Sequence, residues 1–364
     1  MTTVESSVAY RCLPATETRS AGLRVCPFSE EDASCWEHYV RSHPNGSFFH
    51  QLGWKRVMEK TYGYRSLYFC AKRGERITGI APSFLISSWM TGRRLISLPF
   101  AVYGGICADD CESEQALISH LEKVALDLDG EYLELRCRGG ELRQGYHLNP
   151  RYATFTMPIN GDVEAMHKAL PKDIRYMIRK GEKAALRAEH GLHQLETFYK
   201  LVTLNLHRLG TPVFPLKLFE NLISEYASQV NLTVIYCGSK ALAGAMCFCF
   251  REWMQPYYVG ATEDAKTLAA NDFLWWELIK LAAVEGYSIF DFGRSKKNSG
   301  NYQFKGKWNP RIESLNYQVR LLSRADVPDF SPMNSKFTLA TSLWKRLPLG
   351  LTRIIGPHVV RWFP

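Results

Sequence analysis

The segment spanning residues 290–309, FDFGRSKKNSGNYQFKGKWN, gathers residue types that group-transfer chemistry uses. Asp291 ends a predicted strand, where α/β proteins often place functional groups. Arg294 can bind a carboxylate or phosphate through two parallel hydrogen bonds, and Lys305, between aromatic neighbours, can stabilise an oxyanion or a phosphate. Tyr302 is a further candidate. We predict a catalytic or binding loop here; the alternative is a basic surface loop held by its aromatic residues.

A second group of basic residues lies on a predicted helix over residues 171–191, in which Pro171 suits the first helical position. Arg175 and Arg179 are four residues apart and therefore share one face of this helix. Such a face is either simply solvated or contacts phosphate or RNA backbone. We treat both arginines as candidate substrate-binding residues.

The elements that must position these residues occur twice in the same order: helices, antiparallel strands around a short turn, a helix and a strand. Gly79 and Gly244 differ by 165 positions, and Glu134 and Asp291 by 157, so the near-constant offset indicates a duplication. The alternative is a chance similarity of two α/β segments. The predicted helices are 52–60, 114–128, 196–208, 217–228 and 271–286, and the predicted strands are 66–72, 77–87, 132–136, 232–237, 242–250, 256–262 and 288–293.

This order predicts an α+β fold rather than the strict alternation of a doubly wound parallel sheet. A strand pair followed by a glycine break and a helix matches GNAT-type acyltransferases, in which two neighbouring strands separate to admit the acyl donor. We predict two tandem GNAT-like domains, each with one such unit. The predicted boundaries are a flexible arm over 1–24, a first domain over 25–155, a second domain over 156–325 that includes the basic helix 171–191, and an amphipathic tail over 326–364.

Four sequence segments make the resemblance more specific: DFGRS with GNYQFKGKW, RYMIRKGEKA, LHRLGTPVFP and VYGGI. Together they resemble the FemAB family, and most closely its branch found beside exosortase (PEP-CTERM) and exopolysaccharide loci. The resemblance covers roughly residues 25 to 325. Members of the family in peptidoglycan synthesis move an amino acid from aminoacyl-tRNA to an amine of a nucleotide-linked precursor, so the resemblance implies an aminoacyl- or acyltransferase.

The resemblance also implies roles for particular residues. Lys305 matches the family's functional lysine, which would stabilise the tetrahedral intermediate or orient the donor ester. Arg208 stands where a family arginine contacts substrate phosphate, and Asp109 resembles an acidic residue near the acceptor amine. Gly105 and Tyr258 complete the predicted substrate-binding residues. No Ser/His/Asp arrangement is present in the sequence pattern, so we expect direct attack of an amine or hydroxyl on the acyl carbon, without a covalent intermediate.

The sequence departs from ordinary acyl-CoA enzymes in one segment. Their phosphate-binding loop, Gln/Arg-x-x-Gly-x-Gly/Ala, is replaced here by GATEDAKTLAAND at 260–272. This argues against tight acetyl-CoA binding through backbone amides at a helix N-terminus. We therefore expect no tightly bound cofactor, and the donor is either aminoacyl-tRNA or acyl-CoA. The ten cysteines show no zinc-ligand spacing, so we expect no metal and a reducing compartment.

Charge and hydropathy limit the partners. The net charge of +9 fits an anionic donor such as aminoacyl-tRNA or acyl-CoA, although it also fits a mildly basic surface without function. We expect no signal peptide and no membrane-spanning helix, and hence a cytoplasmic protein. In the tail, residues 342–364 combine apolar residues at helical spacing with basic residues and two tryptophans, which suits peripheral contact with the anionic inner face of a membrane. The alternative is a tail that packs on the protein, and Pro348 and Pro357 would interrupt its helix.

Three functions follow. The first is transfer of an aminoacyl or acyl group to a cell-envelope or exopolysaccharide precursor, with a glycan or a nucleotide- or lipid-linked acceptor. The second is an acyl-CoA-dependent N-acyltransferase, and the third is a GNAT-fold binding protein without catalysis.

Overall fold

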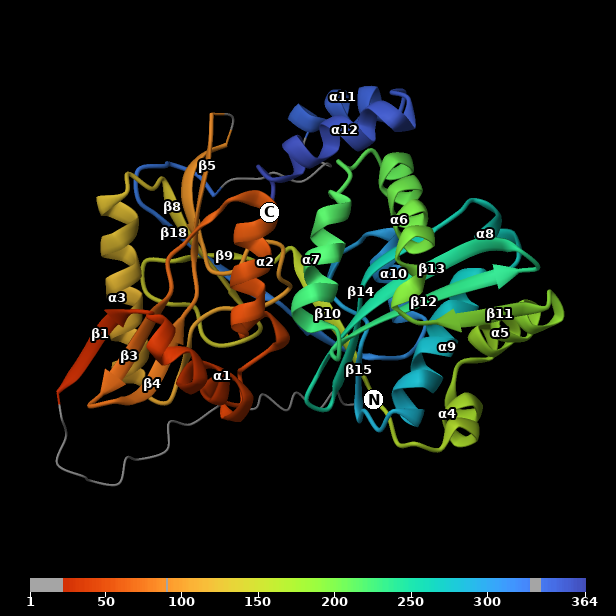
Figure 1. Ribbon diagram of the computed structural model, residues 1–364, viewed down its shortest axis with the longest axis horizontal. Helices are drawn as coiled ribbons and strands as arrows, with labels where there is room; N and C mark the ends of the chain where they lie inside the picture. Colours follow the sequence, from red (N-terminus) through yellow and green to blue (C-terminus); the bar gives the residue numbers. More distant parts are fainter. Residues whose placement is uncertain (1–21, 90, 328–334) are drawn as a thin grey trace, which may run out of the picture.

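The computed structural model describes residues 22–89, 91–327 and 335–364, which form two lobes placed side by side (Figure 1). Residues 1–21 of the predicted arm lie outside the described residues. Its last residues do not belong to an arm, because β1 begins at Leu23 and pairs with β3. The mixed α/β composition predicted from the sequence is confirmed.

The first lobe contains a four-stranded sheet, ordered β1-β3-β4-β7, and a six-stranded sheet, ordered β2-β5-β6-β8-β18-β9. Its strands are β1 (Leu23–Pro27), β2 (Arg65–Ser66), β3 (Phe69–Arg73), β4 (Arg76–Ala81), β5 (Phe84–Ser88), β6 (Gly92–Ile96), β7 (Cys107–Ala108), β8 (Tyr132–Cys137), β9 (His147–Asn149) and β18 (Asn316–Leu321). Its helices are α1 (Ala33–Ser42), α2 (Leu52–Tyr62) and α3 (Cys111–Asp127), with 3-10 turns at Glu30–Asp32 and Phe48–His50.

The second lobe is built on one eight-stranded sheet, ordered β11-β12-β13-β14-β15-β10-β16, with β17 also paired to β10. Its strands are β10 (Tyr152–Pro158), β11 (Leu186–His190), β12 (Val230–Cys237), β13 (Lys240–Phe250), β14 (Trp253–Ala261), β15 (Ile289–Asp291), β16 (Ser295–Lys296) and β17 (Arg311–Ser314). Its helices are α4 (Val163–Ala169), α5 (Lys172–Lys183), α6 (Leu195–Leu209), α7 (Leu216–Tyr226), α8 (Asp264–Thr267), α9 (Ala270–Val284) and α10 (Gly300–Gly306), with a 3-10 turn at Leu192–Gln194. Two further helices, α11 (Ser335–Trp344) and α12 (Leu349–Val360), follow at the end of the chain.

The sheets divide the chain differently from the predicted boundaries of 25–155 and 156–325. β10 starts at Tyr152 and already belongs to the second sheet. β18 returns to the first lobe, where Asn316–Leu321 pairs with β8 across the full strand. Tyr317 and Val319 bury their side chains there, a long-range pairing that no local periodicity reveals.

The predicted basic helix over 171–191 is wrong in its second half. Helix α5 ends at Lys183, and Ala185 adopts a left-handed conformation with φ of 53°. The chain then forms β11, whose Leu186–His190 pairs antiparallel with β12. Arg187 therefore lies on a strand, where its guanidinium stacks 5.3 Å from the ring centre of Tyr236. Pairing with β11 gives the backbone N–H and C=O groups of β12 their hydrogen-bond partners, and this tertiary interaction outweighs the local helix propensity.

An aromatic core fixes the two lobes against each other. Phe48 of the first lobe stacks on Phe248 of the second, with ring centres 4.3 Å apart. Phe49 lies 5.2 Å from Tyr257 in the same cluster. Burying each such ring contributes about 1.5–3 kcal/mol, so the lobes share one core and form one unit.

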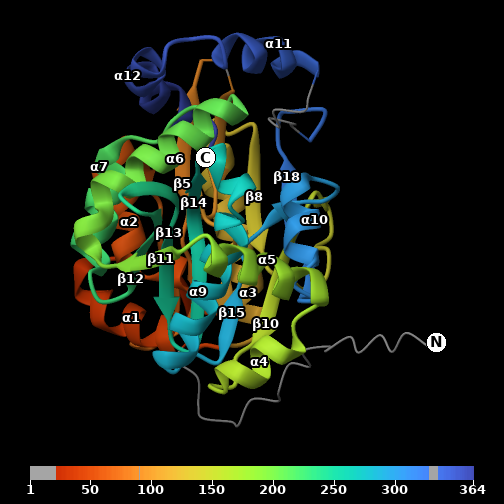
Figure 2. The same ribbon diagram turned by 90° about the vertical axis from the view of Figure 1, so that its right-hand side faces the viewer.

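In the second lobe, helices cover both faces of the sheet (Figure 2). On one face, α9 buries Phe273 and Trp275 among the side chains of a second core cluster. On the other face, α6 comes so close to β14 that a Cβ on Gly260 would lie 2.4 Å from the backbone nitrogen of Val202. Only glycine permits this approach.

Candidate active site

The site is built where β14 and β15 separate. The two strands run parallel and pair only at Trp253 with Ile289 and at Met254 with Phe290. Beyond this point the chain after β15 follows β10, because the backbone nitrogen of Phe292 donates to the oxygen of Phe155 at 2.8 Å. Strand β14 instead continues beside β13. The parallel neighbours therefore diverge beyond Met254 and Phe290, and we call the place where their backbones separate the opening.

Gly293 lies at this opening with a φ of +73°. A Cβ there would lie 3.4 Å from the carbonyl oxygen of Pro256 on β14 and 3.8 Å from Nζ of Lys305. The missing side chain thus lets the turn after β15 lie close to β14 and to the ammonium group of Lys305.

Lys305 reaches the same point from α10. The helix starts at Ser299, whose Oγ accepts a hydrogen bond from the nitrogen of Tyr302 at 3.2 Å. Nζ of Lys305 donates to the carbonyl oxygens of Gly293 and Arg294, at 2.9 and 3.1 Å. It also lies 5.8 Å from the ring centre of Phe155. Burial lowers the pKa of Lys305 to about 7; the nearby charge of Asp291 opposes this shift and that of Arg294 adds to it.

Arg294 is held by aromatic residues rather than by a carboxylate. Its guanidinium donates to the hydroxyl of Tyr317 at 2.9 Å and stacks 4.8 Å from the ring centre of Tyr152. These neutral partners leave its positive charge without a counter-ion among these contacts. A buried cation in such a setting favours an anionic or strongly polarised ligand.

Asp291 is fully buried and accepts four hydrogen bonds. Oδ1 accepts from Thr154 Oγ1 and from the nitrogen of Gly293, at 2.9 and 2.8 Å, and Oδ2 accepts from Gln255 Nε2 at 2.9 Å. The fourth donor is the hydroxyl of Tyr103 from the first lobe. These bonds occupy both oxygens, so the carboxylate orients the loop that carries Gly293 instead of facing a ligand.

A loop of the first lobe covers the opening. This loop contains Tyr103. Its carbonyl oxygens also accept hydrogen bonds: Phe100 accepts from the hydroxyl of Tyr257, and Val102 accepts from the hydroxyl of Tyr317. The sequence does not reveal these contacts, because VYGGI enters the sequence analysis only through the family resemblance and the prediction for Gly105. Its tyrosine beside a glycine pair was the available signal.

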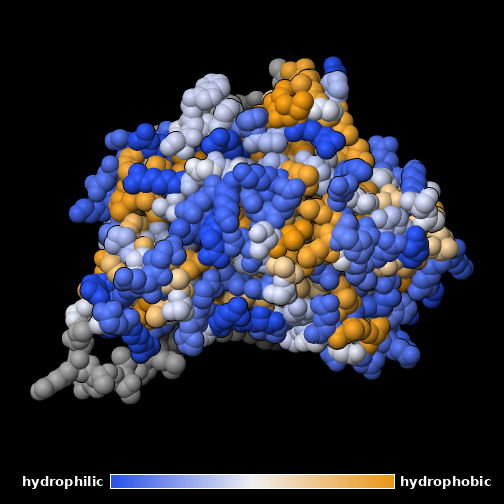
Figure 3. All heavy atoms as spheres, in the orientation of Figure 1, coloured by the Kyte–Doolittle hydropathy of each residue, from blue (hydrophilic) through white to orange (hydrophobic). Residues whose placement is uncertain are grey.

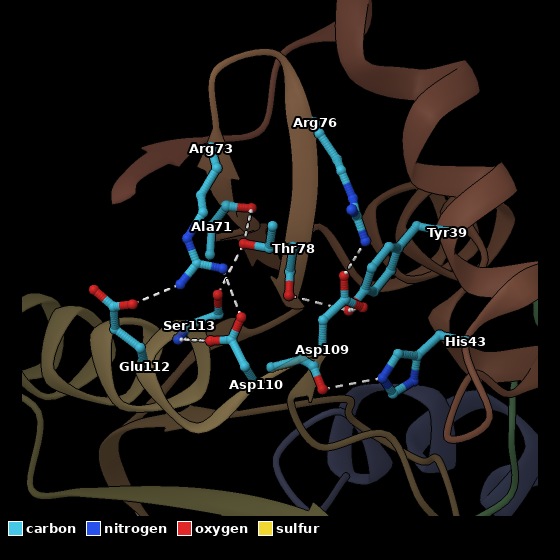
Figure 4. A network of polar contacts seen from close by, with 11 residues as sticks. Tyr39, His43, Ala71, Arg73, Arg76, Thr78, Asp109, Asp110, Glu112 and Ser113 are labelled. Atoms are coloured by element: carbon cyan, nitrogen blue, oxygen red, sulfur yellow. Dashed lines mark hydrogen bonds and ion pairs between the residues drawn. The ribbon is translucent and has the colours of Figure 1, made fainter. Parts of the chain in front are cut away.

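Asp109 belongs to a separate polar network in the first lobe (Figure 4). Its carboxylate accepts from the hydroxyl of Tyr39 at 2.9 Å and pairs with Arg76 at 3.0 Å. His43 bonds through Nε2 to the neighbouring carbonyl oxygen of Ala108 at 3.1 Å. An open groove of about 640 Å³ runs along these residues. Asp110 next to it has a structural role, because it caps α3 by accepting from the nitrogen of Ser113 at 2.8 Å.

Of three other predicted residues, Tyr258 lies near the opening, and Gly105 and Arg208 lie elsewhere. Tyr258 is buried beside the opening, and its hydroxyl has no partner in the part of the chain that the structure describes. Gly105 accepts from His50 Nε2 at 2.9 Å through its carbonyl oxygen. Arg208, exposed in the last turn of α6, bonds to Asn205 at 2.8 Å.

Arg175 and Arg179 do not join the opening. They lie on α5, which packs on α9 at the outer end of the second lobe (Figure 1). Arg175 donates to the carbonyl oxygen of Leu170 at 3.1 Å. Tyr302 packs edge-on against Phe155, with ring centres 5.0 Å apart. The structure therefore gathers Lys305, Arg294, Asp291, Tyr302 and Tyr258 at one site, and places Asp109, Arg208, Arg175 and Arg179 elsewhere.

Residues 168–306 match the family model described as acetyltransferase (GNAT) domain. The fold of this chain is similar to that of FemX, with a TM-score of 0.62 at 13% identity over 82% of this chain and 98% of that one. It is also similar to the C-terminal domain of a putative lysylphosphatidylglycerol synthetase from Agrobacterium fabrum, with a TM-score of 0.55 at 12% identity, covering 80% and 93% of the two chains.

A third solved structure, a tandem GNAT protein from the clavulanic acid biosynthesis pathway, matches with a TM-score of 0.53 at 8% identity, covering 84% of this chain and all of that one. No curated protein sequence matches this chain. The tandem GNAT-like fold is confirmed. The family match, together with this fold, supports an acyltransferase.

Proposed function

We propose that this protein transfers an aminoacyl or acyl group onto an amine or hydroxyl of a cell-envelope or exopolysaccharide precursor in the cytoplasm. One observation carries the proposal: Lys305 places a buried ammonium group at the opening between β14 and β15, inside the segment that matches the GNAT domain. In GNAT-type enzymes the acyl donor enters between two such strands.

The chemistry needs a positive group at the acyl carbonyl. When the acceptor attacks the carbonyl carbon, the oxygen becomes an oxyanion, and collapse of the intermediate breaks the bond to the leaving group, which takes up the proton that the acceptor loses. An ammonium has three N–H donors, and two of those of Lys305 bind the carbonyl oxygens of Gly293 and Arg294. The third can donate to the oxyanion.

The donor site lies in the second lobe alone. With the repeat offset of 157, Gly293 corresponds to Arg136 in the first lobe. There the side chain of Arg136 is buried and donates to the carbonyl oxygens of Leu98 and Ala101, at 3.2 and 3.3 Å. Its backbone oxygen accepts from Gly104 at 2.9 Å. The corresponding gap of the first lobe is thus filled by the chain itself.

Between the two donor classes, the start of α9 argues against acyl-CoA. In acyl-CoA enzymes a phosphate sits on the amides of this helix N-terminus. Here the short helix α8 packs directly before it, and the first turn of α9 carries Asp272, whose carboxyl pKa is raised by burial. An acidic group at this place opposes phosphate binding.

Acyl-CoA stays the second candidate donor, because the matched family is one of acetyltransferases. For the acceptor, the groove beside Asp109 offers a carboxylate and a tyrosine hydroxyl, which suit an amine or a sugar hydroxyl. The place of this protein in an exosortase and exopolysaccharide system rests on the sequence resemblance.

A thermal-shift titration with charged tRNA, uncharged tRNA and acyl-CoAs tests the proposal, with wild type and Lys305→Met in parallel. We expect stabilisation by charged tRNA that exceeds that by uncharged tRNA and weakens in the variant. Stabilisation by acyl-CoA alone would move the assignment to the second candidate. No response to any donor would overturn the proposal.

A further inference from the structure

The end of the chain is anchored on the first lobe by its backbone. Arg94 donates to the carbonyl oxygen of Trp362 at 2.6 Å, and Arg136 donates to that of Pro364 at 2.7 Å. The hydroxyl of Tyr64 bonds to the oxygen of Arg361. These contacts confirm that the tail packs on the protein. They also fix the orientation of the helices that precede these residues.

Helix α12 buries one side only. Thr352, Gly356 and Val360 are buried, and a Cβ on Gly356 would lie 2.7 Å from the backbone nitrogen of Val213. Pro348 separates α11 from α12, whereas Pro357 lies inside α12 without ending it, which corrects the prediction of two interruptions.

The opposite side of the tail is apolar and exposed. Ile354 is 69% exposed and Leu343 is 55% exposed, and Leu351 and Ile355 also face solvent. The neighbouring hairpin of β5 and β6 adds Trp89, which is 85% exposed and lies 6.3 Å from Trp362 between ring centres. We call this surface, made of Trp89, Leu343, Leu351, Ile354, Ile355 and Trp362, the tail face.

The tail face protrudes, and most of its residues belong to a segment whose charged residues are all basic. Helices α11 and α12 and the end of β5 extend from the same side of the molecule in both ribbon views (Figures 1 and 2), and apolar atoms gather there (Figure 3). Residues 335–364 contain five basic residues and no acidic one. Of these, Lys345, Arg346 and Arg353 are exposed, and the guanidinium of Arg353 lies 5.7 Å from the ring centre of Tyr199 on α6.

We propose that the tail face docks on an anionic lipid bilayer. An exposed tryptophan, large exposed aliphatic side chains on a protruding surface and basic residues on the same segment are the features by which a peripheral protein binds the lipid interface. Large exposed apolar side chains beside one another have a cost in water unless a partner covers them. Because the charged residues of 335–364 are all basic, their charge favours an anionic partner.

Docking in this way places a predicted substrate contact near the lipid headgroups. Helix α12 packs on α6, and His207 bonds to the carbonyl oxygen of Leu347 at 2.8 Å. Arg208 follows directly in the last turn of α6 and is exposed. A lipid-linked phosphate held in the bilayer could therefore reach this arginine.

Vesicle co-sedimentation of the full chain tests the inference. We expect binding to phosphatidylcholine vesicles that contain phosphatidylglycerol, and at least tenfold weaker binding to pure phosphatidylcholine. The double variant Trp89→Ser/Ile354→Ser should lose tenfold or more in affinity, and Lys345→Gln/Arg346→Gln should lose the preference for anionic vesicles. Val284→Ser is the matched control, because Val284 is 80% exposed on α9, away from the tail.

Unchanged melting temperatures would show that the variants fold. Equal binding by wild type and the Trp89/Ile354 variant would overturn the inference, as would equal losses in that variant and the control. A concentration-dependent dimer that the same variant abolishes, without vesicle binding, would assign the tail face to a second copy of this chain and also overturn it.

Discussion

The hydroxyl of Tyr103 in the first lobe donates a hydrogen bond to Oδ2 of Asp291 in the second lobe. The acceptor is fully buried, and its other oxygen holds the nitrogen of Gly293 at 2.8 Å. A single carboxylate thus connects the lobe interface to the backbone turn that receives Lys305. The position of Lys305 depends on the contact between the lobes.

Removing this hydroxyl should destabilise the protein. Tyr103→Phe leaves Oδ2 of Asp291 with Gln255 as its remaining partner, and we expect a loss of about 1–3 kcal/mol in the free energy of unfolding. Urea denaturation measures it. Tyr176→Phe is the matched control, because Tyr176 is 61% exposed, and it should change stability by less than about 0.5 kcal/mol. Equal effects would refute the role of the bond.

The lowered pKa of Lys305 predicts a pH dependence of stability. Between the folded pKa of about 7 and the usual value of 10.5, the unfolded chain binds more protons than the folded protein, so stability from this group rises with pH in that window. Below about pH 6 both states are protonated and the full cost of burying the charge remains. A tenfold difference in proton affinity between the two states corresponds to about 1.4 kcal/mol.

Lys305→Met tests this prediction because it removes the titrating group. The difference in unfolding free energy, wild type minus variant, should increase as the pH is raised from 7 to 9 and become constant below about pH 6. A difference that does not vary with pH would contradict the burial of a charged Lys305.

If the groove beside Asp109 binds the acceptor, a change at Asp109 should alter the KM for the acceptor and not the KM for the donor. Asp109→Asn should raise the KM for the acceptor about tenfold, equivalent to about 1.4 kcal/mol, and leave the KM for the donor unchanged. The Arg76 side chain of its ion pair is 78% exposed, so loss of this pair should change the melting temperature little. Glu112→Gln, which alters an exposed ion pair with Arg73 nearby, is the control and should leave both KM values unchanged.

The close approach of α6 to β14 predicts a strong effect at Gly260. In Gly260→Ala the new Cβ would lie 2.4–2.6 Å from backbone atoms of Leu201 and Val202. Relief of this clash requires a shift of helix α6 or strand β14, because no flexible side chain is involved. We expect a loss of at least about 2 kcal/mol. In Gly350→Ala the added Cβ meets nothing within 4 Å, so thermal unfolding should show no loss there. Similar melting temperatures for both variants would contradict the packing described.

The sequence predicted part of the elements of both lobes, among them helices α2, α3, α6, α7 and α9 and strands β3, β8, β12, β13 and β14, because each is marked by local periodicity and turns. It also located the loop with Lys305, since lysine, arginine and glycines cluster within a few positions there. It could not show that β18 returns to the first lobe, nor that Tyr103 bonds to Asp291 across 188 positions. Such pairings depend on which surfaces remain to be buried after both lobes have formed.

Long-range packing also explains why some predicted site residues have another place or role in the structure. Arg175 and Arg179 share a helix face as predicted, but α5 lies on the outer side of the sheet. Asp291 has the residue type of a catalytic acid, yet its hydrogen-bond partners come from three separate segments of the chain. Residue type and spacing identify candidates, whereas burial and hydrogen bonding decide among them.

The most direct test of the account follows radiolabelled amino acid from charged tRNA into nucleotide-linked and lipid-linked precursor fractions. Wild type should transfer label, and Lys305→Met should do so at least about a hundredfold more slowly while keeping a folded state. Transfer by Lys305→Met at the wild-type rate would contradict the assignment of Lys305 and the opening between β14 and β15 as the catalytic site.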